Sequence, residues 1–441
     1  MNLLRTILFL LGLAPAVAHA GRLPVLLISI DGLRPDCVLK ADEYGLKIPN
    51  LRRMVAAGAS ATGVHGVLPT VTYPSHTTLV TGVSPARHGI LANTTFDPAN
   101  LNYGGWYWYA EDIKVPALWD AAGEAGLTTA NVHWPVTVGA KIDWNLPQYW
   151  RATTPDDRKL LRALSTPGLL DLLERGLPPY ADGGDESLAA DQNRAKYAAR
   201  LLELKRPAFM TVYFASLDHV EHAFGPFSPE ANSTLEQIDA LVGALGEAAG
   251  PGTVVAVVSD HGFVRIGKDV NLLTEFLKAG LITVDDSGKV KAWQAAGWGA
   301  GASGAVMLNP EAPAGTKERV TELLARVRKD PANGIARVLD EDETKKLGGF
   351  PGAAFVVALQ PGFSFGAGVT GPLVTDSSMR GMHGYLPELA DMNSTFLIAG
   401  PGISAGRSLG GIDMRDIAPT LAAILGVRLA QAEGHNVLAD R

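Results

Sequence analysis

The sequence predicts an α/β fold in which a mostly parallel sheet is sandwiched by helices and carries an inserted α+β cap. Several short apolar runs are continuous rather than alternating, which is typical of strands buried on both faces. Helical patterns separate these runs, as in parallel sheets whose crossover connections are helices. Between about residues 262 and 376 the pattern changes to short strands and two helices joined by turns rich in Gly and Pro, which indicates an insertion.

The individual elements follow from these patterns. The apolar runs that predict strands are PVLLISID (24–31), TTANVHW (128–134), PAFMTVYFASLD (207–218), TVVAVVSDH (253–261) and STFLIAGPG (394–402). The helical patterns cover residues 47–57, 116–126, 188–204 and 229–249. We therefore expect a leader at 1–20, a core formed by 21–265 and 376–441, and a cap at 266–375.

The first 20 residues have the pattern of an export signal. Arg5 gives a positive start, Thr6 to Leu13 form a short apolar stretch, and Ala18-His19-Ala20 is a cleavage site of the small-x-small type. The apolar stretch is too short to span a bilayer comfortably, so an uncleaved anchor is the less favoured alternative. We expect a periplasmic or secreted protein with no membrane span after cleavage.

Composition narrows the class of protein further. The chain of 441 residues has one cysteine, Cys37, so no intramolecular disulfide is possible. An exported protein without disulfides fits a bacterial periplasm better than an animal extracellular fluid. The formal net charge is −7 and no long basic block is present, so a nucleic-acid partner is not expected.

Three of the predicted strands end in an aspartate: Asp31, Asp218 and Asp260. The carboxyl ends of parallel strands meet at one edge of a sheet, where ligands bind. Three carboxylates that are close together repel one another and need cations. A single aspartate at a strand end is more often a helix cap or a turn residue, so the argument depends on the combination.

Three histidines accompany these aspartates. His222 lies one helical turn after Asp218, His261 follows Asp260, and His383 comes after the insertion. Carboxylate and imidazole ligands without thiolates suit zinc or a similar divalent ion, and six ligands suit two ions better than one. Two-metal sites are typical of displacement at phosphorus. His219 and Glu221 are rival ligands in this segment.

The stretch PTVTYPSHTTLVTG (69–82) offers three candidate catalytic side chains: Thr72, Ser75 and His76. Beside two cations a hydroxyl needs no histidine base, because the cation lowers its pKa. We expect a helix over about Ser75–Thr81, with Ser75 as its cap and Thr72 before it, facing the metals.

Six motifs carry a resemblance to a known family. In chain order they are SIDGLRPD, PTVTYPSHTTLVTG, RHGILANTTFDP, LDHVEHAFGP, VVSDHGF and GMHGYLPELADMNSTFLIAGPG. This series resembles the type I phosphodiesterase/nucleotide pyrophosphatase family of the alkaline phosphatase superfamily, over about 24–265 and 376–426. The resemblance implies an alkaline phosphatase-like core and a compact bacterial member, since the many cysteines of the animal members are absent.

The resemblance also implies the roles of single residues. Thr72 is the implied nucleophile, which forms a phosphothreonine. One zinc ion is implied at Asp218, His222 and His383, and the other at Asp31, Thr72, Asp260 and His261. Asn93 and the backbone N–H of Tyr73 are the implied donors to the phosphate oxygens. His76 is expected to support the helix rather than act as a base, and Ser75 replaces the asparagine that is usual in the family.

The substrate class follows less directly. Tyr73 is the best candidate to stack on a base, whereas most of the other aromatic side chains, in 103–110 and at 134–150, are expected in the core. The Lys-x-Arg pair of the monoesterase branch is absent between Asn93 and Asp218. We therefore expect diester or pyrophosphate substrates, nucleotides in particular. The alternatives are an alkaline phosphomonoesterase and a non-catalytic zinc- or phosphate-binding protein of the periplasm.

Overall fold

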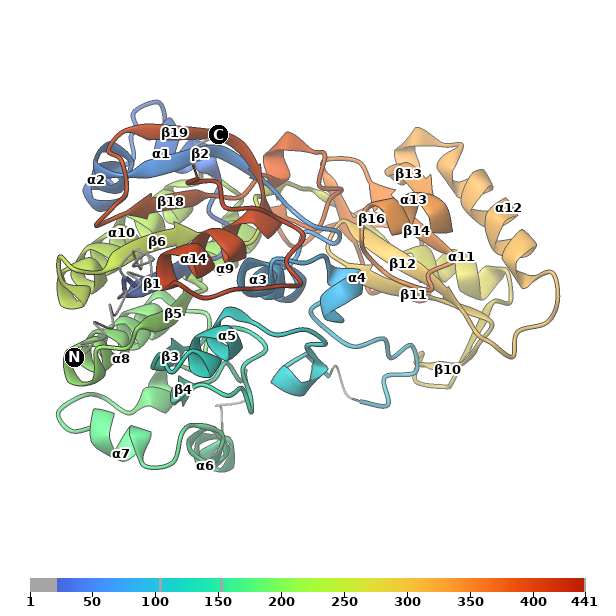
Figure 1. The fold of residues 1–441 in the computed structure, drawn as a ribbon. Coiled ribbons are helices and arrows are strands. Elements are labelled where there is room, and N and C mark those ends of the chain that lie inside the picture. The colour runs from blue at the N-terminus through green and yellow to red at the C-terminus, as the bar shows by residue number, and fades with distance from the viewer. Residues whose placement is uncertain (1–21, 103–104, 151–153, 440–441) are drawn as a thin grey trace, which may run out of the picture.

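The fold is built on one eight-stranded sheet that lies between two layers of helices (Figure 1). The computed structural model describes residues 22–102, 105–150 and 154–439. The strands, in spatial order, are β19 (Arg407–Asp413), β2 (Ala59–His65), β18 (Phe396–Ala399), β6 (Val254–Val258), β1 (Val25–Ile30), β5 (Phe209–Phe214), β3 (Thr129–Val132) and β4 (Trp144–Leu146). Only β18 runs antiparallel to its neighbours in this sheet. The predicted α/β class with a mostly parallel sheet is confirmed.

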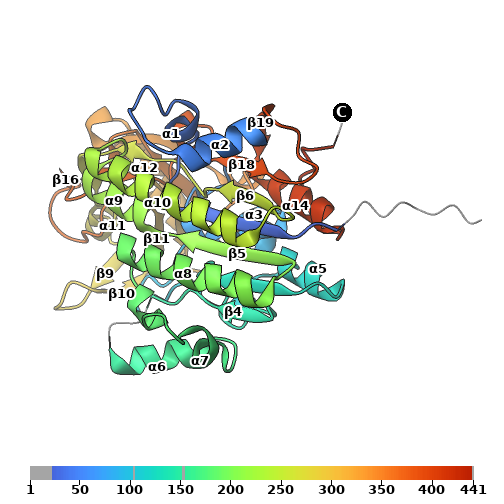
Figure 2. The ribbon, with the colours of Figure 1, turned by 90° about the vertical axis from the view of Figure 1, so that its left-hand side faces the viewer.

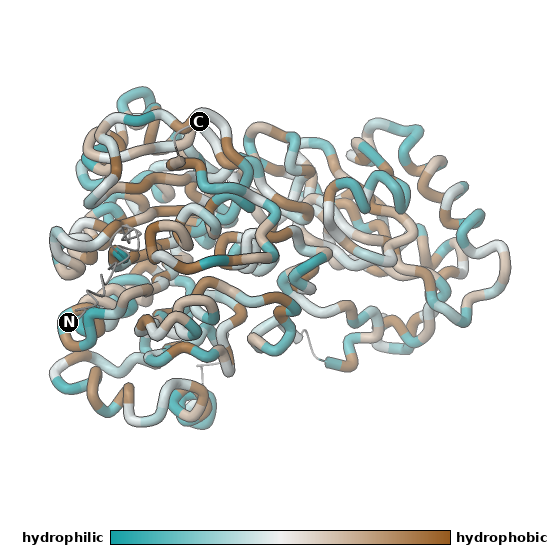
Figure 3. Tube along the Cα trace, viewed as in Figure 1, coloured by the Kyte–Doolittle hydropathy of each residue, from teal (hydrophilic) through white to brown (hydrophobic). Residues whose placement is uncertain are grey.

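The central strand β1 shows why the apolar runs are continuous. Leu26, Ile28 and Ile30 pack under the helices α2 (Pro49–Ala57), α8 (Leu188–Lys205) and α10 (Pro229–Ala249). Val25 and Leu27 face the opposite layer, which contains α3 (Thr72–Thr81), α5 (Leu118–Glu124) and α14 (Ile417–Leu425). Both faces of the strand are therefore buried under helices, as is typical of parallel sheets covered on both faces. Figure 2 shows α8 and α10 side by side across one face of the sheet. In Figure 3 the central strands have the brown colour of hydrophobic residues.

Five further helices connect these layers: α1 (Pro35–Leu39), α4 (Pro85–His88), α6 (Pro155–Leu164), α7 (Leu169–Leu173) and α9 (Ser216–Phe224). No helix among the described residues is both long enough and apolar enough to cross a bilayer. The predicted leader, and Tyr103 and Gly104 of the aromatic stretch, lie outside the described residues.

The inserted segment begins and ends at one small antiparallel pair, β7 (Val264–Arg265) with β17 (Gly381–Met382). Between them lie three small sheets: β9 (Ile282–Val284) with β10 (Val290–Trp293); β15 (Phe363–Phe365), β8 (Lys268–Val270) and β16 (Val374–Asp376); and β11 (Ala295–Ala300), β12 (Ser303–Leu308), β14 (Phe355–Leu359) and β13 (Ile335–Leu339). The helices α11 (Leu272–Lys278), α12 (Thr316–Arg328) and α13 (Glu341–Lys346) accompany them. This segment has its own apolar cluster and lies to the right of the main sheet in Figure 1.

The buried Asp239 of α10 is expected to stabilise the contact between α10 and α2. Its carboxylate accepts the backbone N–H groups of Asn50 at 3.1 Å and Leu51 at 2.7 Å, in the first turn of α2. Asp239→Ala leaves these donors without a partner, so the free energy of unfolding should fall by about 2 kcal/mol. Urea denaturation followed by circular dichroism measures this loss. The exposed Gln237→Ala, on the same helix, should change stability by less than about 0.5 kcal/mol, and an equal loss in both variants would contradict the capping role.

Candidate active site

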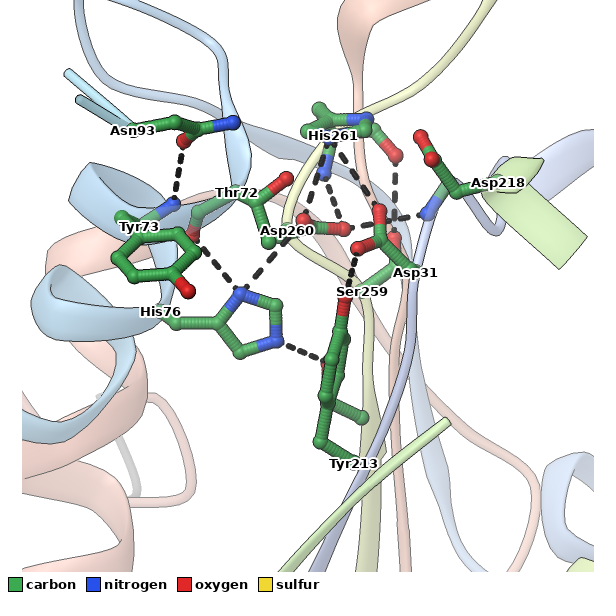
Figure 4. A network of polar contacts seen from close by, with 12 residues as sticks. Asp31, Thr72, Tyr73, His76, Asn93, Tyr213, Asp218, Ser259, Asp260 and His261 are labelled. Carbon is green, nitrogen blue, oxygen red and sulfur yellow. Dashed lines mark hydrogen bonds and ion pairs between the residues drawn. The ribbon is translucent and has the colours of Figure 1, made fainter. Parts of the chain in front are cut away.

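Three adjacent strands bring the three aspartates to one edge of the sheet. β1 is the middle strand, between β5 and β6. Asp31 directly follows β1, Asp260 follows β6 after one intervening residue, and Asp218 lies in the first turn of α9, which begins just after β5. The carboxyl ends of these parallel strands lie at the same edge of the sheet. The three aspartates therefore lie close together, as the sequence predicts. Figure 4 shows the resulting network.

One group of possible ligands consists of Asp31, Asp260 and His261. The His261 Nε2 atom lies 3.3 Å from Asp31 Oδ1 and 3.2 Å from Asp260 Oδ2. All three side chains are buried. The second oxygen of each carboxylate is already bonded: the Tyr213 hydroxyl donates to Asp31 Oδ2, and the backbone N–H of Gly32 donates to Asp260 Oδ1 at 3.1 Å. One oxygen of each aspartate is thus left facing His261.

The other group consists of Asp218, His222 and His383. Asp218 lies between the two histidines: its Oδ2 is 3.5 Å from His222 Nε2, and its Oδ1 is 3.5 Å from His383 Nε2. The rings of His383 and His261 stack at 3.6 Å, so the two groups are neighbours. The rivals His219 and Glu221 belong to neither group. His219 is exposed and pairs with Glu186 at 3.2 Å.

The histidines are held with Nε2 free to coordinate. Each Nδ1 contacts a backbone carbonyl: His222 that of Gly381 at 3.0 Å, His261 that of Gly262 at 3.2 Å, and His383 that of Thr70 at 3.2 Å. A carbonyl only accepts, so the proton lies on Nδ1 and the Nε2 lone pair points at the carboxylates. This is the usual orientation of a histidine that binds a metal.

The fit to cations rests on polar atoms that the protein leaves unsatisfied. Four buried polar atoms have no hydrogen-bond partner among the described residues: Asp31 Oδ1, Asp218 Oδ1, Asp260 Oδ2 and His261 Nε2. Burial raises the pKa of Asp31 and of Asp218 well above the usual range, and the pKa of Asp260 to about 7. Burial lowers the pKa of each of the three histidines. Buried carboxylate oxygens and unprotonated histidine nitrogens that face one another without a proton between them are costly in free energy. A divalent cation bound in each group would give these atoms a partner.

The helix that carries Thr72 begins earlier than predicted. α3 starts at Thr72 rather than at Ser75, because Val71 is the last extended residue and Pro74 fits in a first turn, where its missing N–H costs nothing. Ser75 is therefore not the cap: its backbone N–H donates to the Val71 carbonyl, and its buried hydroxyl has no hydrogen-bond partner in the part of the chain that the structure describes. Thr72 is the first residue of the helix, and within the described part of the chain its hydroxyl forms no hydrogen bond.

His76 holds this helix against the sheet. Its Nδ1 contacts the Thr72 carbonyl at 2.8 Å and lies 3.5 Å from Asp260 Oδ2, while its Nε2 accepts from the Ser29 hydroxyl at 2.8 Å. Burial lowers the pKa of His76 to about 3, so the ring is neutral. The geometry agrees with the prediction that His76 supports the helix, because both ring nitrogens are engaged away from the Thr72 hydroxyl.

Tyr73 differs from the prediction. Its ring is fully buried in the core, against Trp106 at 5.2 Å, so no face is open for a base to stack on. Its backbone N–H, which the resemblance implies as a phosphate donor, instead donates to Asn93 Oδ1 at 2.9 Å. This bond leaves the amide nitrogen of Asn93 as the available donor on this side of Thr72 (Figure 4).

Two features escaped the sequence analysis. One is Tyr213, which lies in the middle of an apolar strand where nothing marks its hydroxyl. The other is a fully buried ion pair on α8, in which Arg194 contacts Asp191 at 2.6 Å. The Asp191 carboxylate accepts the N–H groups of Ala215 at 3.1 Å and Ser216 at 2.9 Å, at the start of α9. The sequence did contain a signal for this buried ion pair: two oppositely charged residues lie three positions apart on the apolar face of a predicted helix.

The raised carboxylate pKa values predict how the metal-free protein responds to pH. A carboxyl whose pKa is higher in the folded than in the unfolded state stabilises the fold at low pH, and this contribution is lost as pH rises through the folded pKa. Between pH 6.5 and 8 unfolded histidines lose their remaining protons, and because the pKa values of the buried histidines are lowered in the folded state, this favours the fold as pH rises. The contribution of the Asp260 carboxyl is therefore measured as the difference between the wild type and Asp260→Asn. After chelation, the free energy of unfolding of the wild type, relative to that of Asp260→Asn, should fall over this window by roughly 1 kcal/mol. A difference between the two metal-free proteins that stays constant or grows from pH 6.5 to 8 would contradict this reading.

Comparisons with known proteins agree with this geometry. The family model for type I phosphodiesterase / nucleotide pyrophosphatase matches residues 25–386. An uncharacterised pyrophosphatase/phosphodiesterase of Schizosaccharomyces pombe is 29% identical over 249 residues, which are 54% of this chain and 44% of the relative. A venom phosphodiesterase of Naja atra is 26% identical over 261 residues, 55% of this chain and 26% of the relative. The chain thus matches less than half the length of these relatives.

Solved structures show the same fold. Human ectonucleotide pyrophosphatase/phosphodiesterase 5 superposes with a TM-score of 0.67 at 20% identity, over 95% of this chain and all of that chain. An inactive threonine-to-alanine variant of the murine protein, in complex with AMP, gives 0.68 at 19% identity, over the same shares of the two chains. At such identity the likeness supports the fold alone, whereas the family model covers most of the chain. The chain belongs to the type I phosphodiesterase / nucleotide pyrophosphatase family.

Proposed function

We propose that this protein is an exported, metal-dependent hydrolase of phosphodiester or pyrophosphate bonds, with nucleotide-type substrates favoured. The observation that carries the proposal is the pair of Asp/His groups at one sheet edge, with Thr72 at the start of an adjacent helix. The names of the relatives support it, since they include pyrophosphatases and phosphodiesterases. The murine neighbour with bound AMP, inactive after a threonine-to-alanine change, supports a nucleotide ligand and a threonine nucleophile.

Two zinc ions are the proposed cofactors. Asp31, Asp260 and His261, with the Thr72 oxygen, would hold one, and Asp218, His222 and His383 the other. When bound, the ions lower the pKa of the Thr72 hydroxyl and neutralise charge on the reacting phosphate. Carboxylate and imidazole donors without thiolates suit zinc.

The chain's own residues then account for the reaction. The Thr72 hydroxyl loses its proton to solvent and its oxygen attacks phosphorus, so a new P–O bond forms to Thr72 as the bond to the leaving oxygen breaks. The leaving oxygen takes up a proton, and water later cleaves the phosphothreonine to release the product and regenerate the hydroxyl. Asn93 Oδ1 is fixed by the Tyr73 N–H, so its amide hydrogens are positioned to donate to a phosphate oxygen as charge develops.

Two other functions are less well supported. A phosphomonoesterase would be expected to clamp a dianion, and the Lys-x-Arg pair for this is absent from the sequence between Asn93 and Asp218. A storage or transport protein for zinc has no need of a free hydroxyl and an amide donor on one side of the ligand groups.

Thr72→Ala tests the nucleophile. We expect turnover of bis-p-nitrophenyl phosphate to fall by at least about 10³-fold, while zinc content stays near that of the wild type, because three other ligands remain in its group. Thr72→Ser should keep part of the activity. Rapid quenching with a labelled substrate, followed by peptide mapping, should find the phosphoryl group on Thr72.

Ser75→Ala is the matched control, since it removes a hydroxyl from the same helix. It should keep turnover within about threefold, because this hydroxyl is buried, forms no hydrogen bond within the described residues and is not a cap. Label on Ser75, or undiminished turnover by Thr72→Ala, would show that the nucleophile is another group.

A substrate panel tests the reaction class. Under the same zinc concentration, kcat/KM should favour diesters over p-nitrophenyl phosphate by at least about tenfold, which is about 1.4 kcal/mol of transition-state binding. Exhaustive chelation should abolish both activities, and zinc should restore them. Equal or better hydrolysis of the monoester would favour a phosphatase, and zinc binding without any turnover would favour a binding protein.

A further inference from the structure

The hairpin formed by β11 and β12 in the inserted segment reaches the candidate active site. At its turn, the backbone N–H of Ala302 donates to the carbonyl of His383 at 3.0 Å. The backbones are so close that a Cβ atom at Gly384 would lie 2.2 Å from the Ala300 carbonyl oxygen. The insertion is therefore in direct contact with the chain at a proposed metal ligand.

The same hairpin also contacts the loop that carries Asn93. The indole N–H of Trp298, on β11, donates to the Thr94 carbonyl at 3.0 Å. The Trp298 ring packs on Phe96 at 5.6 Å and on Phe350 at 5.6 Å, and the side chain is only 7% exposed. A buried indole N–H needs a partner, so this bond specifies where the loop lies against the cap.

An apolar cluster surrounds this contact. Besides Trp298 it includes Val71 and Ala92, which directly precede Thr72 and Asn93 in the chain, and Leu386, three residues after His383. The cluster is thus packed around the backbone next to three proposed site residues. Core packing of this kind resists displacement, because interiors are as dense as organic crystals.

The other side of the loop is held by residues 105–107 of the same loop and by the first turn of α3. Tyr107 N–H donates to the Asn93 carbonyl at 3.1 Å, Thr95 N–H donates to the Gly105 carbonyl at 2.9 Å, and the Asn93 side chain accepts from Tyr73. Between these bonds, the Thr94 carbonyl is the group that the cap holds.

From this arrangement we propose that Trp298 is a positioning residue for Asn93, and that the insertion completes the catalytic site. The proposal rests on the proposed function, in which Asn93 donates to the reacting phosphate. Loss of the indole bond frees the loop to shift Asn93 relative to Thr72. A small displacement of the Asn93 amide strongly reduces its stabilisation of the transition state, because the hydrogen bond to the phosphate oxygen must form at its normal length when charge develops there.

The test compares Trp298→Phe with Trp293→Phe in zinc-loaded protein. Both residues lie in the cap and contact Phe96, but within the described residues the Trp293 indole has no hydrogen bond. Trp298→Phe should lower kcat on bis-p-nitrophenyl phosphate about tenfold with little change in KM or zinc content. Trp293→Phe should stay within about twofold of the wild type.

A double-mutant cycle separates positioning from general damage to the fold. In an Asn93→Ala background, Trp298→Phe should change kcat by less than about twofold, because the group it positions is gone. An undiminished tenfold loss in that background, or equal effects of the two tryptophan changes, overturns the proposal. Wild-type protein without diester turnover would instead contradict the proposed function.

Should Trp298→Phe fail to fold, β-(3-benzothienyl)alanine at position 298 keeps the ring shape and replaces the N–H with sulfur. The same tenfold loss of kcat is expected for this variant. Wild-type kcat from the folded analogue would overturn the proposal, because the hydrogen bond would then have no role.

Discussion

The structure depends on the convergence of three carboxylates at the end of three parallel strands. Asp31, Asp218 and Asp260 lie where β1, β5 and β6 end, in an interior where carboxylates resist ionisation. Hydrogen bonds from the Tyr213 hydroxyl and from backbone N–H groups offset only part of the free-energy cost of ionising these carboxylates. The oxygens left over face histidine nitrogens that carry no proton. These unpaired oxygens and nitrogens are the atoms that a cation in each group could bind.

Asp260 connects the two ligand groups to α3, the helix that begins at Thr72. Its oxygens contact the backbone of Gly32 after β1, the ring of His261, and His76 in the first turns of α3. His76 in turn contacts the Thr72 carbonyl and Ser29 on β1. The position of Thr72 relative to the ligand groups is therefore set by buried hydrogen bonds rather than by a mobile loop. Preorganisation of this kind suits the proposed reaction at phosphorus, because the proposed donor Asn93 and the proposed nucleophile Thr72 would not need to move during the step.

Much of this could be predicted from the sequence, for a physical reason. Strands buried on both faces leave continuous apolar runs, so all five predicted strands are present in the main sheet. β2 and β19, at one side of the sheet, are rich in glycine and polar residues, and the short β4 lies at the other edge, so none of them leaves such a run. The proposed ligand residues were found because each follows a strand or a turn. Their roles, like that of Thr72, stay predictions. The Tyr73 ring was misjudged because burial depends on the tertiary packing of a helix whose start was placed three residues too late.

Contacts between distant segments are what the sequence could not supply. Asp191 stabilises the start of α9 from another helix, and the cap contacts the Asn93 loop and His383 through residues more than 80 positions away in the chain. Such contacts leave no periodic pattern, because nothing in the local sequence of Trp298 distinguishes it from an ordinary core tryptophan. The insertion divides the core between Asp260 and His383, two proposed ligands of different ions. A segment between two proposed ligands is well located to contact the site, and the β11–β12 hairpin contacts the backbone of one of them, His383, and the loop of the proposed phosphate donor Asn93.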